Sequence, residues 1–218
     1  FPVFRGSARV EPQQPAALDR RGRNDFWARW LARKRFVLAE NRPMREWKML
    51  QPVYTALLPD QLWRGAFREP LFRYDRISST FGEVRYLTSG GGSPHRGIDY
   101  AAPEGWEVVA PARGRVVWAA LTLVRGGLVV IDHGLGVKST AMHLSRVLAR
   151  SNALVQPGQV IGLVGSTGLS TGQHLHFGIT AGNVVVDPAE WHAAPPWPRT
   201  VWYPLVFTDD PEAFIMRE

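Results

Sequence analysis

Short apolar runs separated by glycine-rich spacers dominate the chain after residue 75. The runs are "WEVVA" (106–110), "GRVVWAAL" (114–121), "GLVVID" (127–132), "QVIGLVG" (159–165), "HLHFGIT" (174–180) and "NVVVD" (183–187). Their length and their β-branched residues are typical of strands, and the spacers are typical of turns. Because no helical pattern lies between them, they favour an antiparallel sheet or sandwich over a βαβ repeat. We therefore predict a mainly β domain over residues 76–192.

In the N-terminal third, the apolar residues follow the spacing of a helix and not that of a strand. In "NDFWARWLARKRFVLAEN" (24–41), Asn24 is a candidate helix cap and Asp25 suits the first turn. Five side chains recur at helical spacing on one face of this predicted helix, and we expect that face to pack on the rest of the protein: Trp27, Trp30, Leu31, Lys34 and Leu38.

Prolines punctuate the chain after this helix. Pro43 is expected to start a second helix that Pro52 interrupts, and residues 59–70 read as a connector. We place a domain boundary near Asp75, with a basic arm and helical segment over residues 1–75. The tail, residues 193–218, is expected to pack on the β domain.

Composition narrows the choice of chemistry. The 218 residues include 21 Gly and 17 Pro, which agrees with many turns, and no cysteine, which excludes disulfides, thiolate zinc sites and cysteine nucleophiles. No apolar run approaches the roughly 18 residues of a membrane-spanning helix. Because the chain begins at Phe1 and not at Met, we expect a processed or truncated product, so the sequence leaves open whether a signal peptide or anchor preceded it.

The formal net charge of +7 is unevenly distributed. Residues 1–75 hold 15 of the 26 basic and 8 of the 19 acidic residues, so the remainder is balanced. Such a basic segment suits nucleic acid, anionic lipid or an anionic wall polymer. An arginine-rich helix face in contact with solvent explains the same charges.

The first candidate site is the pair of histidines in "GQHLHFGI". Successive side chains on a strand point to opposite faces, so His174 and His176 share one face while Leu175 and Phe177 share the other. Two imidazoles so placed can converge on one metal ion, or one can bind it while the other serves the chemistry beside it. A solvent-exposed strand face explains the spacing equally well, so further ligands are needed.

The second candidate pair lies in "PHRGIDYAAP". His95 and Asp99 would be about 13 Å apart in an extended chain, so both can reach one ion only if Arg96 and Gly97 form a bend. Convergence with one histidine of the 174/176 pair would give two imidazoles and a carboxylate with one coordination position left open. That donor set is typical of catalytic zinc.

The motifs "HRGID", "AMHLS" and "HLH" occur in the order found in one family. Similar stretches accompany them: "SSTFGEVR" (78–85), "APEGWEVVAPARGRVV" (102–117), "VVIDHGLGVKSTAMHLS" (129–145) and "VQPGQVIGLVGSTGLSTGQHLHF" (155–177). Over about half its length the chain resembles the lysostaphin-type (LytM-like) zinc peptidases, which cut peptidoglycan peptides. The resemblance does not extend to the first 75 residues.

The resemblance implies a lysostaphin-like fold and a Zn²⁺-dependent endopeptidase that hydrolyses peptidoglycan peptides with zinc-activated water. It implies His95, Asp99 and His176 as zinc ligands, and His143 and His174 as the imidazoles that act on water and substrate. One can take and return a proton, and the other can stabilise an oxyanion; which does which stays open. The resemblance also implies an envelope location, periplasmic or extracellular. Binding of the wall or of a regulatory protein by the N-terminal segment is a separate hypothesis that rests on its basic charge, and no nucleic acid partner is expected.

The chain departs from its relatives at two positions. Many carry Tyr where this chain has Ala141 and Glu where it has Gly178, and because neither is a metal ligand we expect an altered groove rather than lost catalysis. A tyrosine near the site occurs in some relatives, but the spacing of Tyr86 does not support an assignment. The glycine-rich segment 85–95 is expected to be mobile and to border the substrate groove.

Other interpretations of these motifs fit the sequence less well. "GLSTG" matches the nucleophile elbow formally, with Ser170 before Asp187 and His192, but a strand pattern comes next where an elbow needs a helix. A phosphate loop lacks its lysine, and Lys138 is in the wrong context for a biotinyl or lipoyl carrier. His133 is expected to be structural or solvent-facing, like His192. A catalytically silent peptidoglycan-binding scaffold or hydrolase activator remains the alternative, although such relatives typically lose ligands that this chain keeps.

Overall fold

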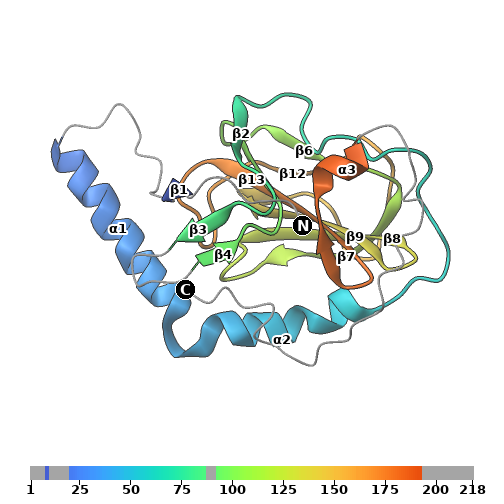
Figure 1. Cartoon of the computed structure of the whole chain (residues 1–218), viewed down its shortest axis with the longest axis horizontal. Helices are drawn as coiled ribbons and strands as arrows, with labels where there is room; N and C mark the ends of the chain where they lie inside the picture. The colour runs from blue at the N-terminus through green and yellow to red at the C-terminus, as the bar shows by residue number, and fades with distance from the viewer. Residues whose placement is uncertain (1–7, 10–19, 87–91, 193–218) are drawn as a thin grey trace.

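The computed structural model describes residues 8–9, 20–86 and 92–192 (Figure 1). The predictions for the tail 193–218, for most of the opening arm and for the centre of the glycine-rich segment therefore fall outside the described residues. Among the helices described, none is long and apolar enough to cross a membrane.

The main sheet contains the strands that carry the candidate site. In spatial order it runs β11 (Leu154–Val155), β7 (Gly114–Leu121), β8 (Gly127–Gly134), β9 (Val137–Leu144), β13 (His174–Ala181), β5 (Ile98–Ala101) and β2 (Arg76–Ser79), with β14 (Val184–Val186) also paired to β13. These pairings are antiparallel. The predicted mainly β, antiparallel architecture is confirmed, and each of the six predicted runs contains a strand.

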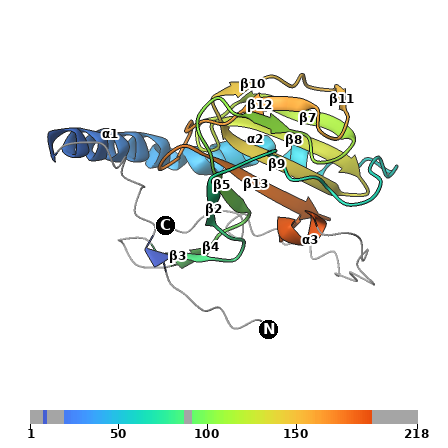
Figure 2. The ribbon, with the colours of Figure 1, turned by 90° about the horizontal axis from the view of Figure 1, so that it is seen from above.

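Two smaller sheets accompany it. One contains β10 (Arg146–Val147), β12 (Val160–Leu163) and β6 (Glu107–Val109), and the other β1 (Ala8–Arg9), β3 (Val84–Tyr86) and β4 (Gly92–Pro94). In Figure 2, β3 and β4 lie on the opposite side of the molecule from β10 and β12. A short helix, α3 (Pro188–His192), ends the described chain.

The principal core fills the space between the main sheet and the β6–β10–β12 sheet. It takes Leu175, Phe177 and Ile179 from β13 and Ile98 and Tyr100 from β5, all at most 4% exposed. Because side chains alternate along a strand, the residues between them face the other side of the sheet. The histidines of "HLH" and Asp99 therefore share the face opposite to this core.

Two helices lie between β1 and β2 in the sequence and meet at a bend (Figure 1). Helix α1 (Arg20–Leu38) begins before Asn24, so the prediction that Asn24 caps it was wrong. The left-handed φ values of Glu40 and Asn41 in the turn η1 (Ala39–Asn41) separate it from α2 (Arg42–Thr55). Pro43 lies in the first turn of α2 as predicted. Pro52 does not interrupt the helix: α2 continues through it to Thr55 and ends one turn after the proline.

Helix α2 covers part of the face on which the candidate site lies. Trp47, Leu50 and Tyr54 recur at helical spacing and pack on Leu128 and Val130 of β8. The face predicted for α1 is less buried than expected, since Leu31 remains 45% exposed. The helix that anchors the N-terminal segment is therefore α2.

The predicted connector contributes directly to the core. Trp63 and Phe67, together with Leu71 just after the connector, are at most 3% exposed and belong to the principal cluster. Backbone hydrogen bonds from Leu62 to the His133 carbonyl and from Leu135 to the Leu58 carbonyl tie the connector to the β8–β9 turn. The segment before Asp75 is thus joined to the β domain by packing and by backbone pairing.

Strand β9 was not among the predicted runs, because half of the residues in its sequence "VKSTAMHL" are polar and they form no continuous apolar run. The structure nevertheless buries it: Lys138 is fully buried, pairs with Asp132 at 3.1 Å and donates to the carbonyl of Ala56 after α2. A buried ion pair is tolerated where further hydrogen bonds satisfy the charges. Tertiary pairing, which a local apolar pattern does not reveal, makes this segment a strand.

His133 occupies a closed interior position away from the candidate site. Its Nδ1–H donates to the carbonyl of Arg113 at 2.9 Å, which leaves Nε2 to accept from the Ser139 hydroxyl at 2.8 Å. Burial lowers the pKa of this imidazole from 6.5 to about 4. The folded protein therefore holds it neutral at pH values where the unfolded chain is protonated.

This difference predicts acid destabilisation. As the pH is lowered from 7 to 5, the unfolded chain takes up a proton at His133 and the folded protein does not. The free energy of unfolding therefore decreases as the pH falls, and the decrease levels off near the folded pKa. We expect this residue to contribute about 2 kcal/mol to the loss of unfolding free energy over that interval, measured by urea denaturation. His133→Gln should lose correspondingly less; equal losses in both proteins would contradict the assignment.

Candidate metal centre

The pairing of β5 with β13 forms the base of the candidate site. Their antiparallel register places Asp99 directly opposite His176, and β2 places Ser79 on the other side of Asp99. Directly opposed residues have Cβ atoms only about 5 Å apart. A carboxylate and an imidazole far apart in sequence are thus adjacent on one sheet face.

A bend before β5 brings in the third side chain. Gly97 passes so close to β13 that a Cβ there would lie 2.4 Å from the Phe177 carbonyl oxygen and 2.8 Å from Nε2 of His176. The absence of a side chain at Gly97 therefore allows the segment to turn, and His95 returns towards Asp99. The sequence prediction of a bend at Arg96 and Gly97 is confirmed.

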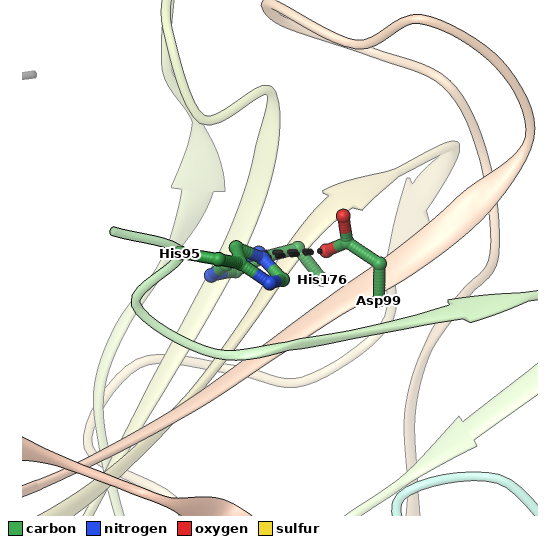
Figure 3. Close-up of side chains that lie close together, drawn as sticks. All are labelled: His95, Asp99 and His176. Atoms are coloured by element: carbon green, nitrogen blue, oxygen red, sulfur yellow. Dashed lines mark hydrogen bonds and ion pairs between the residues drawn. The ribbon is translucent and has the colours of Figure 1, made fainter. Parts of the chain in front are cut away.

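His95, Asp99 and His176 point towards one another (Figure 3). One donor atom from each lies within 4.8 Å of the others. Nδ1 of His176 is 2.8 Å from Oδ1 of Asp99, and Nε2 of His95 is 3.1 Å from the same oxygen and 3.0 Å from Nδ1 of His176. Two imidazoles and a carboxylate in this arrangement could hold a zinc ion and leave a fourth position open.

Neighbouring groups orient this cluster. Nδ1–H of His95 donates to the carbonyl of Thr80 at 2.9 Å, so Nε2 is the ring nitrogen available to a metal. Arg85 donates through Nη2 to Oδ2 of Asp99 at 2.5 Å and leaves Oδ1 for the cluster. Sequence reasoning did not single out Arg85, although "SSTFGEVR" was among the stretches that carried the resemblance.

Electrostatics favours the metal-binding protonation states. Burial alone would raise the pKa of Asp99, but hydrogen bonds and charge interactions with His176 and His95 outweigh it and hold the pKa well below its usual value. Burial lowers the pKa of His176 to about 4 against the opposing effect of Asp99. At neutral pH the pair is therefore an ionised carboxylate beside a neutral imidazole, the forms that bind zinc.

Two more imidazoles stand beside the cluster. The ring centroids of His143 and His174 are 4.8 Å apart, and that of His143 lies 6.2 Å from that of His176. Nδ1–H of His143 donates to the Thr167 carbonyl at 2.8 Å, and Nδ1–H of His174 donates to the Gly172 carbonyl at 2.8 Å. The loop 165–172 thus fixes both rings, and in the neutral form of each imidazole Nε2 is the nitrogen left to accept a hydrogen bond.

The protonation state of His143 depends on its surroundings. Burial, followed by the charges of His174 and His176, holds its pKa well below the ordinary value, whereas the bond to Thr167 acts in the opposite direction. Its imidazole is therefore neutral at neutral pH.

A bulge in β9 aims His143 into this group. Between the pairs Gly127–Leu144 and Val129–Ala141, β9 contains one residue more than β8, and His143 adopts a left-handed φ of 63°. Ala141 and Leu144 consequently both reach the principal core, although strict alternation would place them on opposite faces. The irregularity frees the imidazole between them to join the cluster.

The remaining sequence candidates lie elsewhere. The hydroxyl of Ser170 donates to the Gly172 carbonyl at 2.7 Å, whereas His192 stacks on Phe177 on the opposite face of the sheet. These positions do not form a nucleophile triad with Asp187. Ala141 is buried in the core, while a Cβ at Gly178 would lie 3.9 Å from Nε2 of His176, so of these two departures Gly178 is the one beside the cluster.

Comparisons with known proteins agree with this geometry. Residues 93–188 match the model of peptidase family M23. The chain is 36% identical over 130 residues to the peptidoglycan DD-endopeptidase ShyB of Vibrio cholerae, a match that covers 59% of this chain and 30% of ShyB. The chain spans about three-tenths of the length of the curated relatives it matches first.

Two solved structures share the fold. A zinc-containing peptidase from Vibrio cholerae superposes with a TM-score of 0.56 and 34% identity, covering 61% of this chain and 41% of that one. A variant of the catalytic domain of the prophage-encoded M23 protein EnpA from Enterococcus faecalis gives 0.50 and 31%, covering 57% of this chain and 98% of that domain. Because that M23 domain is matched over almost its whole length at 31% identity and residues 93–188 match the family model, this chain belongs to peptidase family M23.

Proposed function

We propose that the protein is a zinc-dependent endopeptidase that hydrolyses peptide bonds in peptidoglycan. The observation that carries the proposal is the convergence of His95, Asp99 and His176 on one point, beside two imidazoles whose Nδ1 atoms are already occupied. The relative ShyB is named a peptidoglycan DD-endopeptidase, which supports this substrate class. Action on the wall implies a cell-envelope location, periplasmic or extracellular.

His95, Asp99 and His176 would hold the metal. Zinc supplies Lewis-acid chemistry there, which makes water a nucleophile near neutral pH and polarises a carbonyl. Arg85 and the Thr80 carbonyl keep Asp99 and His95 in the orientation that binding requires.

His143 and His174 would move the protons. An unprotonated Nε2 of one imidazole accepts a proton from the attacking water and returns it to the amine nitrogen as the C–N bond breaks. Nε2–H of the other, when protonated, donates to the oxyanion that forms on the carbonyl. Since the carbonyls of Thr167 and Gly172 already hold both rings, little reorganisation is needed during the reaction.

A catalytically silent scaffold is the less favoured alternative, because all five side chains that the mechanism requires are present and adjacent. Gly178, where many relatives carry Glu, leaves more open space beside His176 and is expected to alter the groove without removing a proton carrier. Wall or partner binding remains the proposed role of the basic N-terminal segment.

Metal dependence tests the function directly. Incubation of the protein with purified sacculi should release peptide fragments, chelation should abolish their release and added zinc should restore it. Mass analysis of products from defined muropeptides identifies the bond that is cut. Hydrolysis that persists in the chelated protein would refute the mechanism, and zinc binding without hydrolysis would favour the scaffold.

His143→Ala separates proton transfer from metal binding. Because His143 lies beside the three ligand candidates and is not among them, the variant should keep its zinc, while kcat should fall by at least about 100-fold. Metal content is measured on the purified variant together with muropeptide hydrolysis. Loss of zinc, or unchanged turnover, would assign His143 a different role.

Gly97→Ala tests the bend. The added methyl group would overlap the Phe177 carbonyl and the His176 ring, so the ligands should separate and zinc affinity should fall on the order of tenfold or more in a competition titration. Gly178→Ala is the matched control, since its Cβ would approach no atom closer than 3.3 Å, and it should bind zinc like the parent. Equal affinities in all three proteins would show that the bend is not needed.

A further inference from the structure

We infer that Glu46 of α2 is a positioning residue for His143, although it lies outside the residues that match the family. The inference rests on the proposed function and assigns the N-terminal helical segment a part in the site. Its basis is a chain of hydrogen bonds that runs from the Glu46 carboxylate through the β7–β8 turn to the backbone of His143.

The first link is a buried carboxylate that holds a turn. Glu46 is 5% exposed, on the same helix face as Trp47 and Leu50. Its Oε2 accepts the backbone N–H of Val124 at 2.6 Å, and its Oε1 accepts the backbone N–H and Nη1 of Arg125 at 3.3 and 2.7 Å. Both carboxylate oxygens are thus used on two consecutive residues, which fixes that turn against α2.

The second link joins the turn to the site. The carbonyl of Arg125 accepts the backbone N–H of His143 at 2.9 Å, and the carbonyl of Val124 accepts that of Leu169 at 2.7 Å. Leu169 belongs to the loop 165–172 that holds the His143 and His174 rings. The turn fixed by Glu46 therefore contacts both the backbone of His143 and the loop that orients its ring.

The two loops are packed without space between their backbones. A Cβ at Gly168 would lie 2.3 Å from the backbone nitrogen of Gly126, and one at Gly126 would lie 2.3 Å from Oγ1 of Thr167. A displacement of the 122–126 turn is consequently passed to the 165–172 loop. Close packing of this kind transmits small shifts instead of absorbing them.

The third link is the backbone conformation of His143. A left-handed φ of 63° is an unfavourable conformation for a non-glycine residue and persists only where the surroundings hold it. The bond from its N–H to Arg125 and the 3.3 Å bond from Thr167 N–H to its carbonyl supply that restraint. Without the first, the bulge that aims the imidazole loses its anchor.

Removing the carboxylate would therefore affect the site selectively. Glu46→Ala leaves the Val124 N–H and the partly buried Arg125 guanidinium without their acceptor. Because an unpaired buried donor is unfavourable, the turn is expected to shift so that both groups can bind water or another acceptor. The three ligand candidates lie on other segments and keep their contacts. Because a displacement of about 1 Å can lower a rate 100-fold, turnover should suffer while metal binding does not.

The test compares zinc-loaded Glu46→Ala and Glu46→Gln with the parent on a defined muropeptide. We expect kcat to fall at least tenfold for Glu46→Ala and less for Glu46→Gln, which keeps one acceptor oxygen, with KM and zinc content unchanged. Hydrogen exchange should show faster deuterium uptake in peptides covering residues 122–127 and 165–172, but not in those covering 98–101. Glu40→Gln, at an exposed acid of the same segment, should behave like the parent.

Two results would overturn the inference. In the first, the parent hydrolyses the muropeptide, and Glu46→Ala shows the same kcat and the same hydrogen exchange in both loops as the parent. In the second, Leu50→Val, which loosens the packing of α2 without changing a contact to the turn, lowers kcat as much as Glu46→Ala does. The effect of Glu46→Ala would then come from helix packing and not from the hydrogen bonds to the turn. A parent that binds zinc and does not hydrolyse is a failure of the proposed function, and the exchange experiment on the two loops still tests the link from Glu46.

Discussion

The register of β5 against β13 is the constraint on which the site depends. It places Asp99 opposite His176 on one face and the side chains of the principal core on the other. A slip of one residue would exchange those faces, burying the polar groups and exposing Leu175 and Phe177. The free energy of burying the core therefore also fixes the geometry of the candidate ligands, so that metal binding need not order them.

Around this base the protein uses irregular backbone to bring in the other side chains. Gly97 lets the chain bend within contact distance of β13, and the bulge at His143 redirects a side chain that regular alternation would send elsewhere. Such features cost conformational energy, and the surrounding hydrogen bonds hold them in place. Irregularity thus concentrates where the chemistry is proposed.

The N-terminal segment belongs to this arrangement. Helix α2 covers β8 through Trp47 and Leu50, and the connector places Trp63 and Phe67 in the principal core. Since the buried carboxylate of Glu46 binds the turn beside His143, the helix that stabilises the sheet also contacts a turn that borders the candidate site. The family motifs alone would have left this segment aside as an appendage.

The sequence by itself determined the β class, the six apolar strands and, through the order of the motifs, the candidate site residues. These features depend on the local pattern of apolar residues and on residue type, which the sequence gives directly. It did not reveal β9, whose buried polar residues are stabilised by partners such as Asp132 and the Ala56 carbonyl, nor did it reveal Glu46 or Arg85. Only the tertiary structure decided the pairing of β9, the contacts of Glu46 and Arg85, and the convergence of His95, Asp99 and His176. The reason is that the role of a polar side chain depends on the partner it contacts, and these partners are far apart in sequence.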